Sequence, residues 1–167
     1  SAERTAEKVL FIVITSDRGL CGAYNSNIIK LAKLTIAQQY QAQMDKNKVH
    51  IWAIGKKGWE HFVKNNYTIS AAHKDLFINL RFENVQACAQ AAVKAFESKE
   101  YDRVELVYSE FKNAGTQKFT VERFLPIPKV KAKPGVQKSD FIFEPAKDIL
   151  VAELMPKILN TQLYKAV

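Results

Sequence analysis

Residues 8–30 read KVLFIVITSDRGLCGAYNSNIIK, and this stretch predicts a buried strand, a sharp turn and the start of a helix. Val9–Ile14 is an unbroken, largely β-branched apolar run, which is typical of a strand covered on both faces. Two glycines, Gly19 and Gly22, follow it on either side of Cys21. Because α/β proteins usually place their sites at the carboxyl ends of parallel strands, this turn is the first place to look for a function.

The rest of the chain alternates helical and extended patterns. Apolar residues at helical spacing predict helices over 27–44, 57–64 and 85–96. Apolar and β-branched runs predict strands over 49–54, 67–71, 103–111 and 117–125. The predicted N-caps are Asn25 or Ser26 for the first helix and Asn84 for the third. The second helix is expected to bury three apolar side chains, which are Trp59, Phe62 and Val63.

The last two predicted strands are separated by too few residues for a crossover. The connection at 113–116 can only return the chain beside the strand it has just left, so the two strands should form an antiparallel hairpin. The pattern therefore predicts an α/β fold. Its form would be a three-layer, Rossmann-like domain with a mixed, mostly parallel sheet of about five strands and an antiparallel edge hairpin.

Length and composition are those of one globular domain. The chain has 167 residues, of which 47% are hydrophobic, which is enough for a sizeable core. It contains no apolar run of about 18 residues that could cross a bilayer. Residues 1–8 are polar and do not resemble a signal peptide. The abrupt start directly before a core strand indicates a piece cut from a longer protein.

Charge and cysteine content point to no particular ligand. The net charge is +8, and part of the excess comes from a basic segment with Pro and Gly that holds Lys129, Lys131, Lys133 and Lys138. Aromatic residues are not interleaved with these lysines, so we interpret them as solvated surface rather than a nucleic-acid site. Cys21 and Cys88 fit neither a disulfide scaffold nor a zinc motif, and both are expected to be reduced thiols. Cys88 should fill the core.

A nucleotide site at the first turn is disfavoured by the spacing of its residues. Gly19-Leu20-Cys21-Gly22 is not the G-x-G-x-x-G pattern, and no Gly-Lys-Ser/Thr follows to place a lysine on a phosphate. The acidic residue that would bind a ribose is also missing, since Asp45 comes too late and after a helix. We therefore expect no nucleotide cofactor, and no metal site is indicated.

A cysteine nucleophile at the first turn is a stronger hypothesis than a nucleotide site. Gly19 to Ala23 is close to a G-x-C-x-G/A elbow, and a thiol at a helix N-terminus can have a lowered pKa. Such a site needs a base, and the available histidines are His50, His61 and His73. None comes late in the chain, as the histidine of a triad usually does. The competing interpretation is a tight strand-to-helix corner whose glycines serve only its geometry.

A family resemblance goes further than these patterns. Residues 14–25, ITSDRGLCGAYN, strongly resemble the first strand, turn and helix of the globular domain of the ATP synthase gamma subunit. Later stretches resemble the same family in the same order, and they are VYSEFKN at 107–113, FLPI at 124–127, FIFEP at 141–145 and LMP at 154–156. The resemblance covers nearly all of residues 8–167.

The resemblance implies a domain organisation and a structural motif. Residues 8–145 would be the globular α/β domain, and 146–167 the start of the carboxyl-terminal shaft helix. The family's long amino-terminal helix and most of its carboxyl-terminal helix are absent. The family's hallmark in this chain, which the resemblance implies is structural, consists of Asp17, Arg18, Gly19, Leu20, Cys21, Gly22 and Asn25. No catalytic, cofactor-binding or metal-binding residue carries over.

The resemblance also implies a function. The parent protein would be the non-catalytic central rotor of a proton-translocating ATP synthase, coupling proton flow through the membrane ring to ATP synthesis or hydrolysis. Its partners would be the catalytic alpha/beta hexamer, an epsilon-type subunit and the c-type ring. It would lie peripherally on the cytoplasmic face of the bacterial inner membrane, or on the equivalent organelle membrane. The alternative is a cysteine-dependent hydrolase or amidotransferase that uses Cys21.

Overall fold

The computed structural model describes residues 6–15, 22–64, 68–69, 82–113 and 116–126. The elements in chain order are β1 (Val9–Ile14), α1 (Gly22–Gln39), α2 (Gln41–Asp45), β2 (Val49–Ile54), α3 (Lys56–Lys64), β3 (Thr68–Ile69), α5 (Phe82–Glu97), β4 (Arg103–Asn113) and β5 (Thr116–Leu125). None of the helices in these ranges is long and apolar enough to cross a bilayer.

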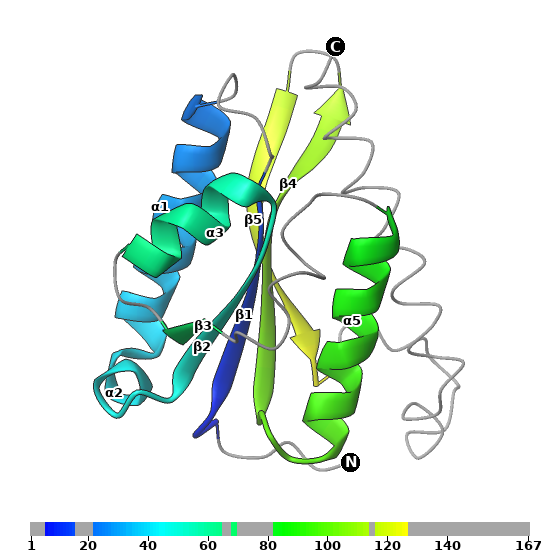
Figure 1. The fold of residues 1–167 in the computed structure, drawn as a ribbon. Helices are drawn as coiled ribbons and strands as arrows, with labels where there is room; N and C mark the ends of the chain where they lie inside the picture. The colour runs from blue at the N-terminus through cyan, green and yellow to red at the C-terminus, as the bar shows by residue number, and fades with distance from the viewer. Residues whose placement is uncertain (1–5, 16–21, 65–67, 70–81, 114–115, 127–167) are drawn as a thin grey trace, which may run out of the picture.

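The strands form one mixed sheet in the order β3-β2-β1-β4-β5 (Figure 1). β1 pairs in parallel with both β2 and β4, and β2 pairs in parallel with β3. β4 and β5 pair in antiparallel fashion, so the predicted edge hairpin is confirmed. The prediction of a mixed, mostly parallel sheet of about five strands is confirmed as well.

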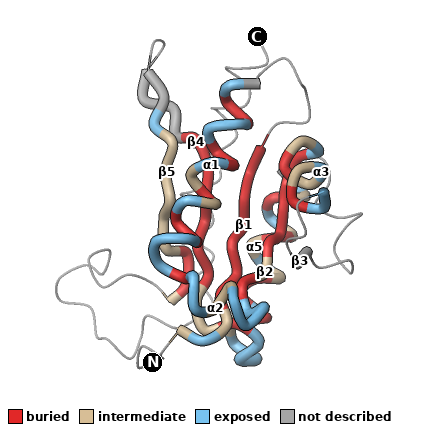
Figure 2. Tube along the Cα trace, turned by 90° about the vertical axis from the view of Figure 1, so that its left-hand side faces the viewer, coloured by how far each residue is buried: buried red, intermediate tan, exposed pale blue. Residues whose placement is uncertain are grey.

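Helices cover both faces of the sheet, which makes the three predicted layers. In Figure 1, α1 and α3 lie on one side of the sheet and α5 lies on the other. Alternate residues of β1 point into the two cores, Leu10, Ile12 and Ile14 toward α5, and Val9, Phe11 and Val13 toward α1. β1 is therefore buried along its whole length, as Figure 2 shows. This two-sided burial explains why its sequence is an unbroken apolar run.

The helix boundaries differ from the predictions. α1 begins at Gly22, five residues before the predicted start, so Asn25 and Ser26 lie inside the helix and the N-cap prediction is wrong. Tyr24 is buried and its ring packs edge-on against Phe119, with ring centroids 6.1 Å apart. This tertiary contact gives the first turn of α1 an apolar side to bury. α5 likewise begins at Phe82, so Asn84 is not its N-cap.

Other differences are smaller. α3 begins one residue earlier than predicted and buries Phe62, whereas Trp59 is only partly buried. Val63 is 51% exposed, so its predicted burial is wrong, because the residue after an inward-facing Phe62 is turned about 100° around the helix axis. Of the predicted strand at 67–71, the structure describes Thr68–Ile69, which form β3, and the hairpin strands are slightly longer than predicted. Segment 146–167 and the four lysines at 129–138 lie outside the described residues.

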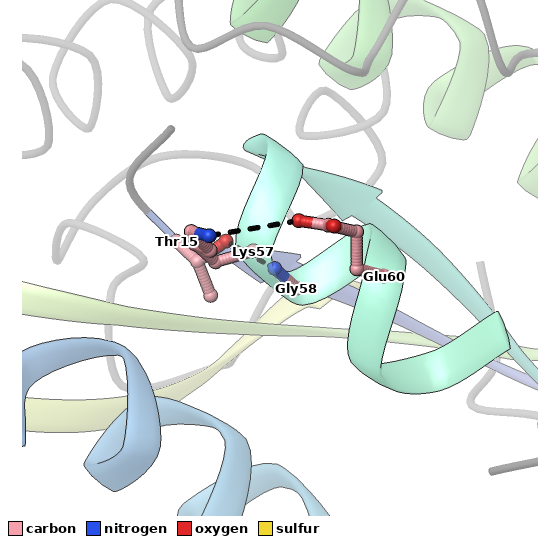
Figure 3. A network of polar contacts seen from close by, with 4 residues as sticks. All are labelled: Thr15, Lys57, Gly58 and Glu60. Carbon is pink, nitrogen blue, oxygen red and sulfur yellow. Dashed lines mark hydrogen bonds and ion pairs between the residues drawn. The ribbon is translucent and has the colours of Figure 1, made fainter. Parts of the chain in front are cut away.

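The carboxyl end of β1 is locked to α3 by Thr15. The buried Thr15 hydroxyl accepts the backbone N–H of Gly58 (2.8 Å) and donates to the carbonyl of Ile54 (3.4 Å). The Thr15 backbone N–H also donates to that carbonyl (2.8 Å). Figure 3 shows Thr15 beside the first turn of α3, with the Lys57–Glu60 ion pair (3.8 Å) on the same helix. The threonine thus satisfies one N–H at the start of α3.

Two glycines make this close approach possible. Gly55 has φ +98°, and a Cβ there would lie 2.1 Å from the backbone oxygen of Thr15. A Cβ at Gly58 would lie 2.9 Å from the Thr15 hydroxyl oxygen. A Cβ at Gly55 would therefore clash with backbone atoms, whereas a Cβ at Gly58 would clash with a side chain, which a substitution at Thr15 can remove.

Gly55→Ala is therefore expected to lower the free energy of unfolding by roughly 2–5 kcal/mol, from left-handed strain plus overpacking. Gly58→Ala should cost about 1–2 kcal/mol, because overpacking is partly offset by helix propensity. Urea denaturation of both variants in wild-type and Thr15→Ala backgrounds tests this. The Thr15→Ala background should reduce the cost of Gly58→Ala and leave most of the cost of Gly55→Ala. If the Thr15→Ala background lowered the stability cost of both glycine substitutions equally, or of neither, the packing described would be contradicted.

Candidate functional site

The predicted motif is divided between described and undescribed parts of the chain. Asp17 to Cys21 lie outside the described residues. Gly22 is the first residue of α1, and Asn25 lies in the first turn of that helix, 5% exposed. The described flank of the corner, at Thr15, is close-packed against α3. The structural interpretation of the corner remains a prediction for its central residues.

The cysteine and histidine side chains that can be located do not form a nucleophilic site. Cys88 is fully buried in the core beneath α5, as predicted, and burial raises the pKa of its thiol, which disfavours a thiolate. His50 Nδ1 lies 2.8 Å from the hydroxyl of Tyr101, and burial lowers the pKa of this imidazole. Burial also lowers the pKa of His61, with a smaller contribution from the charge of Lys33. Cys21 and His73 lie outside the described residues.

Metal ligation finds no support in the ranges that the structure describes. No group of three or more His, Cys, Asp or Glu side chains in these ranges is placed to hold a metal ion. A small open depression of 120 Å³ is lined by Ala6, Glu7, Ala42, Gln43, Lys46 and Lys48. It lies beside α2, at the end of the sheet where β1 begins, and not at the carboxyl ends of the parallel strands.

The most unusual polar group is a carboxylate that the sequence reasoning missed. Glu105 interrupts the apolar run of β4 and is only 5% exposed, on the same face of the sheet as α1. Tyr40, which is 2% exposed, donates its hydroxyl hydrogen to Glu105 Oε2 (2.9 Å). Arg103 donates to the Tyr40 hydroxyl (3.1 Å), and its guanidinium lies 5.8 Å from the centre of the tyrosine ring. Arg123 stands directly opposite Glu105 on β5.

This cluster explains why the first predicted helix is broken. The prediction was one helix over 27–44, but Tyr40 has φ −132° and ψ 25° and separates α1 from α2. Its backbone N–H still donates to the carbonyl of Ile36 (2.8 Å), while its side chain reaches Glu105 and packs edge-on against Phe11. The tyrosine thus fastens the end of α1 to the middle of the sheet. The acidic Glu105 between the apolar Val104 and Leu106 was a sequence signal for a buried charge, although not for its partner.

Burial and the neighbouring groups shift the pKa values of Glu105 and Tyr40 in opposite directions. Burial raises the pKa of Glu105 above its ordinary value of 4.5, and the hydrogen bond from Tyr40 and the charges of Arg123 and Arg103 offset only part of that rise. Burial also raises the pKa of Tyr40, against the lowering effect of the hydrogen bond from Arg103. Perturbed carboxylates occur at catalytic sites and also in structural networks. Here Glu105 and Tyr40 are both buried, and their contacts join the end of α1 to β4.

The raised pKa has a definite consequence for stability. Between pH 4.5 and the folded-state pKa, the folded chain holds this proton more tightly than the unfolded chain does. The contribution of Glu105 to the free energy of unfolding therefore falls as pH rises through that window. Glu105→Gln cannot titrate, so we expect the stability difference, wild type minus Glu105→Gln, to become more negative from pH 4.5 toward neutral pH.

Urea denaturation at a series of pH values measures this difference. Tyr40→Phe serves as the companion variant, because losing the hydrogen bond should raise the pKa of Glu105 further and extend the window upward. A difference between wild type and Glu105→Gln that does not change with pH would show that Glu105 titrates normally.

Comparison with known proteins gives the family directly. A family model described as ATP synthase matches residues 1–167. The ATP synthase gamma chain of Cytophaga hutchinsonii is 42% identical over 167 residues, covering 98% of this chain and 56% of the relative. The gamma chain of Flavobacterium johnsoniae is also 42% identical, covering 100% of this chain and 56% of the relative. The chain thus spans little more than half the length of these curated relatives.

Solved structures agree on the fold. The chain matches a structure of the central stalk and c-ring of the Tetrahymena thermophila mitochondrial ATP synthase with a TM-score of 0.61 and 19% identity, over 98% of this chain and 73% of that one. It matches the rotor of the Euglena gracilis mitochondrial ATP synthase with a TM-score of 0.53 and 16% identity, over 95% and 63%. At such identities the likeness concerns the fold alone. The similarity to the bacterial gamma chains, together with the family model that spans all 167 residues, shows that this chain belongs to the ATP synthase gamma-chain family.

Proposed function

We propose that this chain is the globular α/β domain of the central rotor subunit of a proton-translocating ATP synthase. The observation that carries the proposal is 42% identity to bacterial gamma chains across essentially the whole chain. The matched region runs over 167 residues and so spans the core, the hairpin and the first corner, which is more than a shared fold alone would give.

The proposed role is mechanical. The relatives are nearly twice as long, and we propose that their additional residues include the shaft helices that enter the catalytic alpha/beta hexamer, with residues 8–145 as the globular domain and 146–167 as the start of one shaft helix. Rotation of the membrane ring would turn the domain and the shaft together, and the shaft would drive the catalytic subunits through their nucleotide-binding states. The reverse direction would couple ATP hydrolysis to proton pumping.

The domain itself would have no catalytic role. Its buried polar groups join elements to one another, as at Thr15 and Glu105, and the open depression beside α2 is lined by other residues. The proposed partners are the hexamer, the c-type ring and an epsilon-type subunit, on the cytoplasmic face of a bacterial inner membrane or its organelle equivalent. The comparisons give no support to the alternative of a cysteine hydrolase that uses Cys21.

A rotation assay tests the proposal. A complete gamma chain that contains this domain is assembled with its synthase subunits, and a bead is attached through Lys30→Cys, an exposed position on α1, in a Cys21→Ser background. With the hexamer fixed to a surface, ATP should drive continuous rotation of the bead in one direction. The same assembly without the Lys30→Cys attachment site is the control for non-specific bead binding. ATP hydrolysis with a stationary domain, or failure of the domain to co-purify with the hexamer, would refute the rotor function.

A further inference from the structure

The segment that leads into β1, Ala6–Lys8, is bound tightly to the turn before β4. The backbone N–H groups of Glu7 and Lys8 both donate to Oδ2 of Asp102, at 3.1 and 3.0 Å. The backbone N–H of Asp102 donates in return to the carbonyl of Lys8 (2.8 Å). The Lys8 ammonium donates to the carbonyl of Lys99 (2.8 Å). Two of these four hydrogen bonds have an ionised acceptor and one has an ionised donor. These three are stronger than hydrogen bonds between neutral amide groups.

The same segment and the start of β1 are also bound on the other side, to α2 and to the turn that follows it. The Gln43 side-chain amide donates to the carbonyl of Ala6 (2.7 Å). The backbone N–H of Val9 donates to the carbonyl of Lys48 (3.0 Å). The lead-in segment and the first residue of β1 are therefore hydrogen-bonded on one side to the turn before β4 and on the other to α2 and the turn before β2.

The turn that carries Asp102 is itself rigidly attached. The backbone N–H of Glu100 donates to the carbonyl of Ala95 (2.9 Å), which closes the end of α5, and Lys99 has the left-handed φ of 67°. Tyr101 is buried against Trp52, with ring centroids 6.1 Å apart at nearly a right angle. A side chain on this turn is therefore connected to α5, to β4 and to the core beneath α5.

These hydrogen bonds determine which parts of the domain resist a force applied to the chain before residue 6. Without these bonds, the pull would act on the first residue of β1 alone and would break the ladder to its neighbours one bond at a time. With them, the force is also transmitted to β2 and β4 through the segments that precede these strands. Several hydrogen bonds must then break together. The proposed function requires such a pull, because torque must pass between this domain and a shaft.

We propose that Asp102 is a force-bearing positioning residue, which joins the chain leading into β1 to the α5–β4 turn so that torque passes between the shaft and the whole domain. This inference rests on the proposed rotor function and on a shaft helix that precedes residue 6. The effect of Asp102 is on how stiffly the domain is held.

Hydrogen exchange tests the contacts in the chain as it is. In Asp102→Ala, the amide hydrogens of Glu7 and Lys8 should exchange at least about tenfold faster than in wild type, because their charge-assisted bonds are lost. Asp102→Asn keeps a carbonyl oxygen and should show a smaller increase. Asp45→Ala is the matched control, since that aspartate accepts the side-chain amide of Gln41 on the exposed α2. Unchanged exchange in Asp102→Ala would overturn the proposal.

The mechanical test uses the bead assembly described above, with the hexamer stalled and the bead on α1. The angular fluctuations of the bead measure the torsional stiffness between domain and hexamer. Asp102→Ala should lower that stiffness, Asp102→Asn should lower it less, and Asp45→Ala should leave it unchanged. Val93→Ala, which truncates a core side chain of α5 away from the lead-in segment, should lower domain stability without lowering stiffness.

The outcomes separate the two proposals. If the wild-type bead does not rotate with ATP, the rotor function fails whatever the variants show. If it rotates and Asp102→Ala is as stiff as wild type, the force-bearing role fails while the rotor function stands. If Val93→Ala lowers stiffness as much as Asp102→Ala, the effect is one of general stability and the force-bearing role also fails.

Discussion

The whole domain depends on the burial of β1 on both faces and its pairing on both edges. Each of its six residues is buried, and its backbone is hydrogen-bonded to β2 on one side and β4 on the other. A strand with no exposed face accommodates a polar side chain only where that side chain has a buried partner, and each large apolar side chain buried there contributes about 1.5–3 kcal/mol. α1 and α3 must cover one face and α5 the other, because leaving either face open would expose half of this apolar strand.

Polar side chains inside this apolar frame serve as joints between elements. Thr15 fastens β1 to α3, and Tyr40 and Glu105 fasten the end of α1 to β4. At the surface, the partly exposed Asp102 joins the lead-in segment to the turn before β4. Each side chain is satisfied by a partner far away in the sequence, which is how buried polar groups are tolerated. The use of polar groups at joints suits a domain whose proposed work is to hold its shape under torque.

Sequence similarity and structural similarity relate this chain to known proteins at different levels of sequence identity. The bacterial gamma chains are similar enough in sequence to fix the family, whereas the ciliate and euglenid structures share 16–19% identity and show the fold alone. A fold can persist at that distance because its core asks only for apolar side chains of about the right size on each face. Features such as the Glu105 cluster need particular residues at contacting positions, so similarity of fold does not predict them.

Local sequence determined the type and order of the elements, because two-residue and 3.6-residue periodicities and short connections act over a few neighbouring residues. The apolar run of β1, the hairpin between β4 and β5 and the core position of Cys88 could all be predicted in this way. The motif at 14–25 indicated the family, since its residues are specific in type and order. Only the tertiary structure decided where α1 begins and breaks, that Val63 faces solvent, and that Glu105 has partners. Tyr40 and Glu105 are 65 residues apart in the sequence, and the position of Tyr24 is set by Phe119 on the far strand of the hairpin. Contacts over such separations exist only once the sheet has formed, so no local pattern records them.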